Sequence, residues 1–136
     1  MSGPAGRRRS QRGATAVETA IVLPVLLFVI FGVIDFSRML NAQLQLTEAA
    51  REGVRAEVLD ADPAARVQRA VSLTGVTTQV VTACPATPTK DDNGVVTTAY
   101  RFQFITPMGA LASLLGAAFD DDTVTLTGRA AQICTG

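Results

Sequence analysis

A continuous apolar run near the N-terminus constrains this chain more than any other feature. Residues 20–34 include no polar side chain. As an α-helix this run spans about 22 Å, which is less than the roughly 30 Å hydrocarbon core of a bilayer. Extension back to Ala14 gives about 31 Å, which is long enough to cross. The sequence therefore predicts a membrane-spanning helix over residues 14–35, with Asp35 at its C-terminal boundary.

The charges that flank this helix predict its orientation. Four arginines precede the first acidic residue of the chain: Arg7, Arg8, Arg9 and Arg12. By the positive-inside rule, residues 1–13 stay in the cytoplasm and residues 36–136 lie outside it. We therefore expect a single-pass protein of the cytoplasmic membrane, in contact with membrane lipid. A cleaved secretory signal, an ordinary signal anchor and a buried helix of a soluble protein are the alternatives.

Apart from Asp35 at the boundary, Glu18 is the one ionisable residue inside the predicted span. A charge in a membrane-spanning helix costs up to a few kcal/mol, so such a residue is usually retained because it has a partner. If the chain is cut after Gly13, Ala14 carries a new positive amino group and Glu18 becomes the fifth residue. In a bundle of such helices, Glu18 of one subunit would pair with the amino terminus of its neighbour.

The pattern around Glu18 resembles a known family. The stretch from Arg12 to Ala20, followed by Leu23-Pro24 and by Gly32-Val33-Ile34-Asp35, is similar to the TadE-like family. These are pseudopilins of the Tad (Flp-type) pilus assembly system. Residues 49–55, Ala-Ala-Arg-Glu-Gly-Val-Arg, also resemble the family's helix continuation. The chain departs from the family at Thr19, where members often carry an aromatic residue.

The resemblance implies processing by a membrane-embedded prepilin peptidase between Gly13 and Ala14, so that residues 1–13 form a basic leader. Glycine suits this site because the absence of a side chain lets the peptidase approach the scissile carbonyl. The implied role is a minor pilin-like subunit or assembly factor, in the membrane or in a surface pilus. The implied partners are the peptidase and other pilin-like subunits of the Tad system. The alternative is a membrane-anchored extracytoplasmic binding module that does not polymerise.

Pro24 lies inside the predicted span, where it removes one backbone hydrogen bond and is expected to kink the helix. Two interpretations of Pro24 fit the sequence. One is an ordinary kink of a membrane helix, and the other is a locally melted segment that lets subunits pack. Beyond the span, we expect the helix to continue as an amphipathic stem over residues 36–59. Its packed face is predicted from apolar or small residues at helical spacing: Phe36, Met39, Leu40, Leu44, Leu46, Ala50, Gly53, Val54 and Val58.

Residues 60–136 are predicted to form a small extracytoplasmic α+β domain. Asp62 as N-cap and Pro63 as first residue predict a second helix that runs to Leu73, with Gly75 as its stop. Segments rich in Val, Thr and aromatic residues predict three antiparallel strands covered by the stem, at residues 76–83, 95–106 and 124–133. The Asn-Gly ending of residues 90–94 predicts a hairpin loop, and Pro107 is expected to open a short apolar helix that closes near Gly116.

Cys84 and Cys134 both fall on the side predicted to lie outside the cytoplasm, where disulfides persist. A bridge between them would close a loop of about fifty residues, which the chain-entropy model values at roughly 4 kcal/mol. Two unrelated thiols are the alternative. Two cysteines without histidine or a Cys-x-x-Cys spacing predict no metal site.

The composition argues against catalysis and against nucleic-acid binding. The chain has no histidine and a formal net charge of zero. The commonest general base is therefore missing, and there is no basic surface beyond the N-terminal arginines. Acidic clusters at residues 91–92 and 120–122 are predicted to be solvated loops. We expect no enzyme, no cofactor and no small-molecule substrate.

Overall fold

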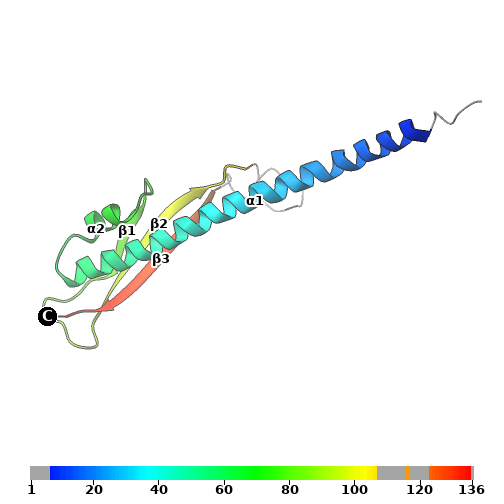
Figure 1. The fold of residues 1–136 in the computed structure, drawn as a ribbon. Coiled ribbons are helices and arrows are strands. Elements are labelled where there is room, and N and C mark those ends of the chain that lie inside the picture. The colour runs from blue at the N-terminus through cyan, green and yellow to red at the C-terminus, as the bar shows by residue number, and fades with distance from the viewer. Residues whose placement is uncertain (1–6, 107–115, 117–122, 136) are drawn as a thin grey trace, which may run out of the picture.

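The computed structural model describes residues 7–106, 116 and 123–135. One long helix, a short helix and a small sheet follow one another along the chain (Figure 1). These elements are α1 (Arg7–Val58), α2 (Pro63–Ala70), β1 (Thr77–Thr82), β2 (Asn93–Gln103) and β3 (Thr123–Ile133). The predicted α+β class and the three-stranded antiparallel sheet are confirmed. The helix predicted from Pro107 to near Gly116 falls outside the described residues, apart from Gly116 itself.

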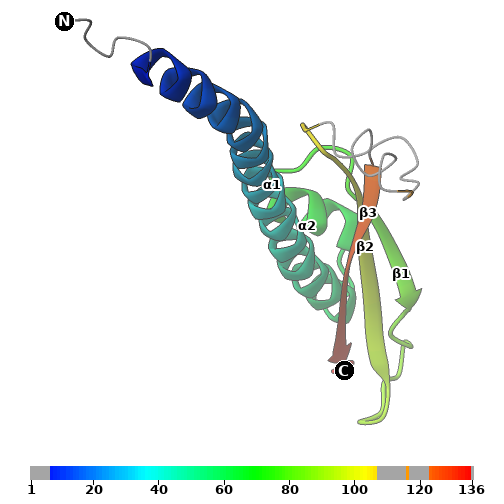
Figure 2. The same ribbon diagram turned by 90° about the vertical axis from the view of Figure 1, so that its right-hand side faces the viewer.

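Helix α1 is unbroken from Arg7 to Val58 and continues through Pro24. Its C-terminal half lies along the sheet, whereas its N-terminal half projects beyond it (Figures 1 and 2). The apolar run and the stem are therefore consecutive parts of a single helix. The sheet begins to cover that helix where the apolar run ends.

The sheet has the order β1-β2-β3, with both pairs antiparallel. The central strand β2 pairs along its whole length with β3, from Asn93 opposite Ile133 to Gln103 opposite Thr123. Its pairing with β1 is shorter and includes an irregularity between Val80 and Thr82. One open edge of the sheet is therefore formed by β1 and the other by β3.

The hairpin predicted between the first two strands is confirmed, but the Asn-Gly pair does not form its turn. Asn93 and Gly94 already belong to β2, where both are paired with β3. The tight turn lies just before them, and it is closed by a hydrogen bond of 3.1 Å from the Asp92 N–H to the Thr89 carbonyl. A Cβ atom at Gly94 would lie 3.1 Å from the Cys84 sulfur, so a larger residue there would have to displace this sulfur by a few tenths of an ångström.

The helix predicted to reach Leu73 ends three residues earlier, at Ala70. Asp62 is the N-cap, as expected, and its side chain accepts a hydrogen bond from the Ala64 N–H. The early end has a visible cause at Ser72. Its N–H donates to the side-chain oxygen of Gln45 on α1, at 3.1 Å, instead of to a carbonyl of its own helix. Gly75 is not a helix stop but a turn residue with a positive φ of 84°.

The face by which α1 packs on the sheet differs in part from the predicted one. Leu46, Ala50, Gly53 and Val54 are buried as predicted, but Phe36, Leu40 and Leu44 are exposed. The buried stripe instead includes several small residues that let β2 and β3 approach the helix backbone. Its most buried apolar members are Ala42, Leu46, Ala49, Ala50 and Val54, which lie against a core that includes Val67, Val96, Phe102 and Leu126.

The closest approach of helix and sheet is at Gly128 of β3. A Cβ atom at this position would overlap the carbonyl group of Leu46 and would lie 2.8 Å from the Thr98 hydroxyl. Thr98, on β2, is fully buried and donates a hydrogen bond of 3.0 Å from its hydroxyl to the same Leu46 carbonyl. This pairing matters because a buried hydroxyl left unpaired costs about 1–3 kcal/mol. Gly128 and Thr98 together therefore fix the position of α1 on the sheet.

We predict that Gly128→Ala destabilises the domain by about 1–3 kcal/mol, because the added methyl group overpacks a contact with helix backbone that cannot move aside. Thermal unfolding of the oxidised protein in detergent, followed by circular dichroism, measures this change. Gly32→Ala is the matched control, since a Cβ atom at Gly32 meets nothing within 4 Å. Equal unfolding temperatures for Gly128→Ala and the unmodified protein would show that the contact is looser than described.

Candidate functional site

The N-terminal half of α1 is the part of the chain most clearly built for contacts outside the molecule. Its large apolar side chains are exposed without interruption, and no other element of the described chain covers them. By length and composition α1 can cross a membrane. The exposed members are Val17, Ile21, Val22, Leu23, Val25, Leu26, Leu27, Phe28, Val29, Ile30, Phe31, Val33 and Ile34.

Glu18 lies on this exposed part of the helix. Among the residues that the structure describes, none forms an ion pair or a hydrogen bond with its carboxylate. The neighbouring polar residue is satisfied within the helix, because the Thr19 hydroxyl donates to the Thr15 carbonyl at 2.9 Å. Glu18 is thus a charged side chain, on a surface that is otherwise apolar, for which the fold supplies no partner.

Gly13 has no structural role that the fold reveals. A Cβ atom there would meet nothing within 4 Å, and α1 begins before it, at Arg7. The bond between Gly13 and Ala14 therefore lies inside a helix. Glycine in a helix interior costs about 0.5–1 kcal/mol relative to alanine. Gly13 weakens the helix and is not required by any close packing within the described fold. Such a glycine is consistent with recognition of this position by another molecule.

The exposed apolar surface continues past the predicted span. Phe36, Leu40 and Leu44 follow one another at helical spacing and are all exposed, with Leu44 at 68 %. They lie on α1 beside the sheet but not under it. Sequence reasoning assigned them to the packed face because their spacing alone does not distinguish two apolar stripes on one helix.

Asp35 joins the helix to the sheet where the apolar run ends, and sequence reasoning treated it only as the boundary of that run. It is 2 % exposed. Its carboxylate accepts hydrogen bonds from the Ile105 N–H at 3.3 Å, from the Thr106 N–H at 3.0 Å and from the Thr106 hydroxyl. Arg38 forms an ion pair with it at 3.0 Å. The strand predicted to end at Thr106 ends at Gln103. The N–H groups of Ile105 and Thr106 donate to Asp35 on the helix and not to a neighbouring strand.

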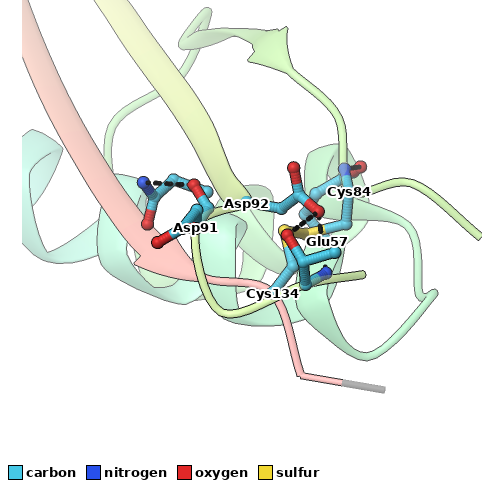
Figure 3. The surroundings of a disulfide bond; sticks show 7 residues. Glu57, Cys84, Asp91, Asp92 and Cys134 are labelled. Carbon is cyan, nitrogen blue, oxygen red and sulfur yellow. Dashed lines mark hydrogen bonds between the residues drawn. A yellow bond between two sulfur atoms is a disulfide. The ribbon is translucent and has the colours of Figure 1, made fainter. Parts of the chain in front are cut away.

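A disulfide bond between Cys84 and Cys134 closes the other end of the domain (Figure 3). Cys84 also donates its N–H to the Glu57 carboxylate at 3.2 Å, and Glu57 lies in the last turn of α1. The Cys134 N–H donates to the Asp92 carbonyl at 2.9 Å. The disulfide therefore joins the C-terminus to the β1–β2 connection, and the hydrogen bond from Cys84 to Glu57 attaches this connection to the end of the stem.

The turn beside this disulfide has its own carboxylate. Two hydrogen bonds from Thr89, from its N–H at 2.7 Å and from its hydroxyl at 2.8 Å, lower the pKa of Asp92. A lowered pKa means that the folded turn favours the charged carboxylate. Its contribution is therefore present above the ordinary pKa of aspartate and is lost as the pH falls through the lowered value. Because both hydrogen bonds come from Thr89 within the same turn, this effect is confined to the turn.

The described residues offer little for catalysis or metal binding. They include no group of three or more histidine, cysteine, aspartate or glutamate side chains that could hold a metal ion. A shallow pocket between α1 and α2 is lined partly by Arg55, Arg66 and Arg69. Arg66 is already paired with Glu52 at 3.1 Å. The pocket holds no nucleophile next to a base.

Comparison with known families gives one match. The family model described as "TadE-like protein" matches residues 13–55. This is the resemblance that the sequence pattern indicated, and the matched segment runs from Gly13 through the apolar run to the stem. No curated protein and no solved structure matched the chain.

We predict that Asp35→Ala releases the loop after β2. Each backbone hydrogen bond to a charged group is worth about 1.5–3 kcal/mol, so amide exchange at Ile105 and Thr106 should accelerate about tenfold to a hundredfold. Hydrogen–deuterium exchange read at individual residues measures this change. Asp91→Ala, which removes an exposed carboxylate in the turn before β2, should leave these two amides unchanged. Unchanged exchange in Asp35→Ala would contradict the role assigned to this carboxylate.

Proposed function

We propose that this chain is a minor pilin-like subunit or assembly factor of a Tad (Flp-type) pilus. The family match over residues 13–55 supports a role in such a system, and the family is a structural one rather than a family of enzymes. Within the chain, the matched segment coincides with the exposed half of α1 and the start of its packed half. Contacts between α1 and other molecules are therefore central to the proposed role.

Glu18 is the observation that carries the proposal. A carboxylate inside an apolar span costs up to a few kcal/mol, and nothing in the described chain offsets that cost. A partner from outside the chain would offset this cost, and a second pilin-like subunit supplies one with the right chemistry. If residues 1–13 are removed, Ala14 of the neighbour carries a positive amino group that pairs with Glu18. Such a pair neutralises both charges in lipid or in the interior of a filament.

Removal of residues 1–13 is assigned to a prepilin peptidase that cuts between Gly13 and Ala14. The open surroundings of Gly13 support this assignment, because the fold itself makes no use of a glycine there. Helix α1 continues through the scissile bond, so the peptidase has to unwind this turn before cutting. A glycine lowers the cost of that unwinding.

The membrane orientation in this proposal follows the charges of the leader. Residues 1–13 lie in the cytoplasm, residues 14–35 cross the membrane and residues 36–136 lie outside. The disulfide between Cys84 and Cys134 suits this orientation, because disulfides persist outside the cytoplasm. Pro24 lies within the membrane-spanning part of α1. We propose that the helix kinks or opens locally at this residue when subunits pack.

The exposed stripe of Phe36, Leu40 and Leu44 supports contacts with other pilin-like subunits. Apolar side chains exposed in a row on a helix mark a surface for another protein or a membrane. In this stripe the apolar surface of the span extends into the extracytoplasmic stem without a break. A neighbouring helix of the same kind would therefore find one continuous surface from Val17 to Leu44.

The alternative is a membrane-anchored binding module that does not polymerise. The open edge of the sheet at β1 favours it, since a strand with free backbone groups can pair with an extended ligand. Val80 and Val81 of this strand are exposed. A permanent anchor of this kind keeps its leader and tolerates loss of the Glu18 carboxylate.

The test is to replace Glu18 in a cell that assembles the pilus. We predict that Glu18→Ala abolishes pili or reduces them severely, because the subunit loses the charge that pairs with its neighbour. Electron microscopy and quantification of sheared pili measure the effect. Glu48→Ala is the matched control, since Glu48 is an exposed carboxylate whose ion pair with Arg51 lies on the stem surface. Normal piliation by Glu18→Ala, at normal protein levels, would favour the anchored module.

A further inference from the structure

The end of the sheet nearest to the apolar run is attached to α1 at a defined position along the helix axis. Ile105 and Thr106 donate their backbone N–H groups to Asp35, which directly follows Ile34, the last residue of that run. The rise of 1.5 Å per residue places Arg38 about 6 Å beyond Ile34 along the helix axis. The loop after β2 therefore lies at the level where α1 leaves the apolar run (Figure 2).

Ile105 is exposed to an unusual degree for its type and place. Its exposed fraction is 73 %, the largest among the large hydrophobic residues that the structure describes. The backbone of the loop is held by Asp35, so this side chain is presented in a defined direction and not by a free segment of chain. Phe36, one residue past Asp35, is exposed as well.

Arg38 adds a cation at the same level. One guanidinium nitrogen binds Asp35, and the guanidinium group lies 5.3 Å from the centre of the Phe102 ring. These two contacts hold a side chain that is still 43 % exposed. A guanidinium carries five N–H donors, and the described residues accept a hydrogen bond from only one of its nitrogens. The remaining donors suit a phosphate, which guanidinium binds in a two-pronged geometry.

We propose that this end of the domain docks on the outer leaflet of the membrane that α1 spans. The Ile105 side chain enters the boundary between headgroups and acyl chains, and Arg38 binds the phosphate of a phospholipid headgroup. The inference rests on the membrane anchoring in the proposed function. Lipid is the occupant because α1 continues directly from this surface into the apolar run, which brings the headgroups to the level of Asp35. A docked domain holds the stem at a fixed angle to the membrane before any subunit is engaged.

The test uses single tryptophan residues, since the chain has none of its own. The full-length variants Ile105→Trp, Val29→Trp and Leu59→Trp are reconstituted in vesicles of phosphatidylcholine and phosphatidylglycerol, with and without brominated acyl chains that quench nearby tryptophan. Val29 lies in the apolar run, and Leu59, which is 67 % exposed, lies at the far end of the stem. We expect quenching and blue-shifted emission for Ile105→Trp and Val29→Trp, and neither for Leu59→Trp. In the Ile105→Trp background, Arg38→Ala should lower the quenching.

Each other outcome overturns a defined part of the inference. Quenching at Val29→Trp without quenching at Ile105→Trp means that the helix is anchored but the domain does not dock. A blue shift at Ile105→Trp without quenching means that another protein surface covers the site. Unchanged quenching after Arg38→Ala refutes the headgroup contact. Absence of quenching at Val29→Trp refutes the docking together with the membrane anchoring.

Discussion

The contact of the Leu46 carbonyl with Thr98 and Gly128 is the interaction on which the rest of the structure depends. It brings the backbone of α1 against β2 and β3 at a distance that no larger side chain at position 128 permits. Several other packed residues of the stem, among them Ala42, Ala49 and Ala50, are small, which allows the same close approach. Because the sheet covers only this narrow stripe, the larger apolar residues of the helix remain free. One helix thereby serves as the core of a small domain over half of its length and as an exposed apolar rod over the other half.

Two further attachments hold the ends of this contact. At the end near the apolar run, the buried carboxylate of Asp35 accepts hydrogen bonds from the backbone N–H groups of Ile105 and Thr106, which follow β2. At the other end, the disulfide and Glu57 fasten the β1–β2 connection and the C-terminus to the last turn of α1. The domain is thus tied to the helix at both ends as well as in the middle.

Much of this architecture follows from the sequence, and the failures have physical causes. The apolar run, the N-cap at Asp62, the three strands and the pairing of Cys84 with Cys134 were predicted, because each rests on local chemistry or on residues that occur only once or twice. The prediction of the packed face of the stem was partly wrong. Leu40 and Leu44 have the same helical spacing as the buried residues, and only the position of the sheet determines which of the two sets is buried. The Asn-Gly pair was misassigned because pairing with β3 places both residues inside β2, and this pairing is not visible in the local sequence. The role of Asp35 depends on amides seventy residues away, and no local pattern reveals it.

Two steps are central to the proposed role: the leader is removed from the helix, and Glu18 then forms the contact with a neighbouring subunit. Intact-mass measurement tests this directly, on the protein expressed with a cognate prepilin peptidase and, in parallel, without one. We expect the loss of residues 1–13 only when the peptidase is present, which makes Ala14 the mature N-terminus. An intact N-terminus in both samples would contradict the account and leave a permanently anchored module. A cut beyond residue 34 would show instead that the apolar run is a secretory signal.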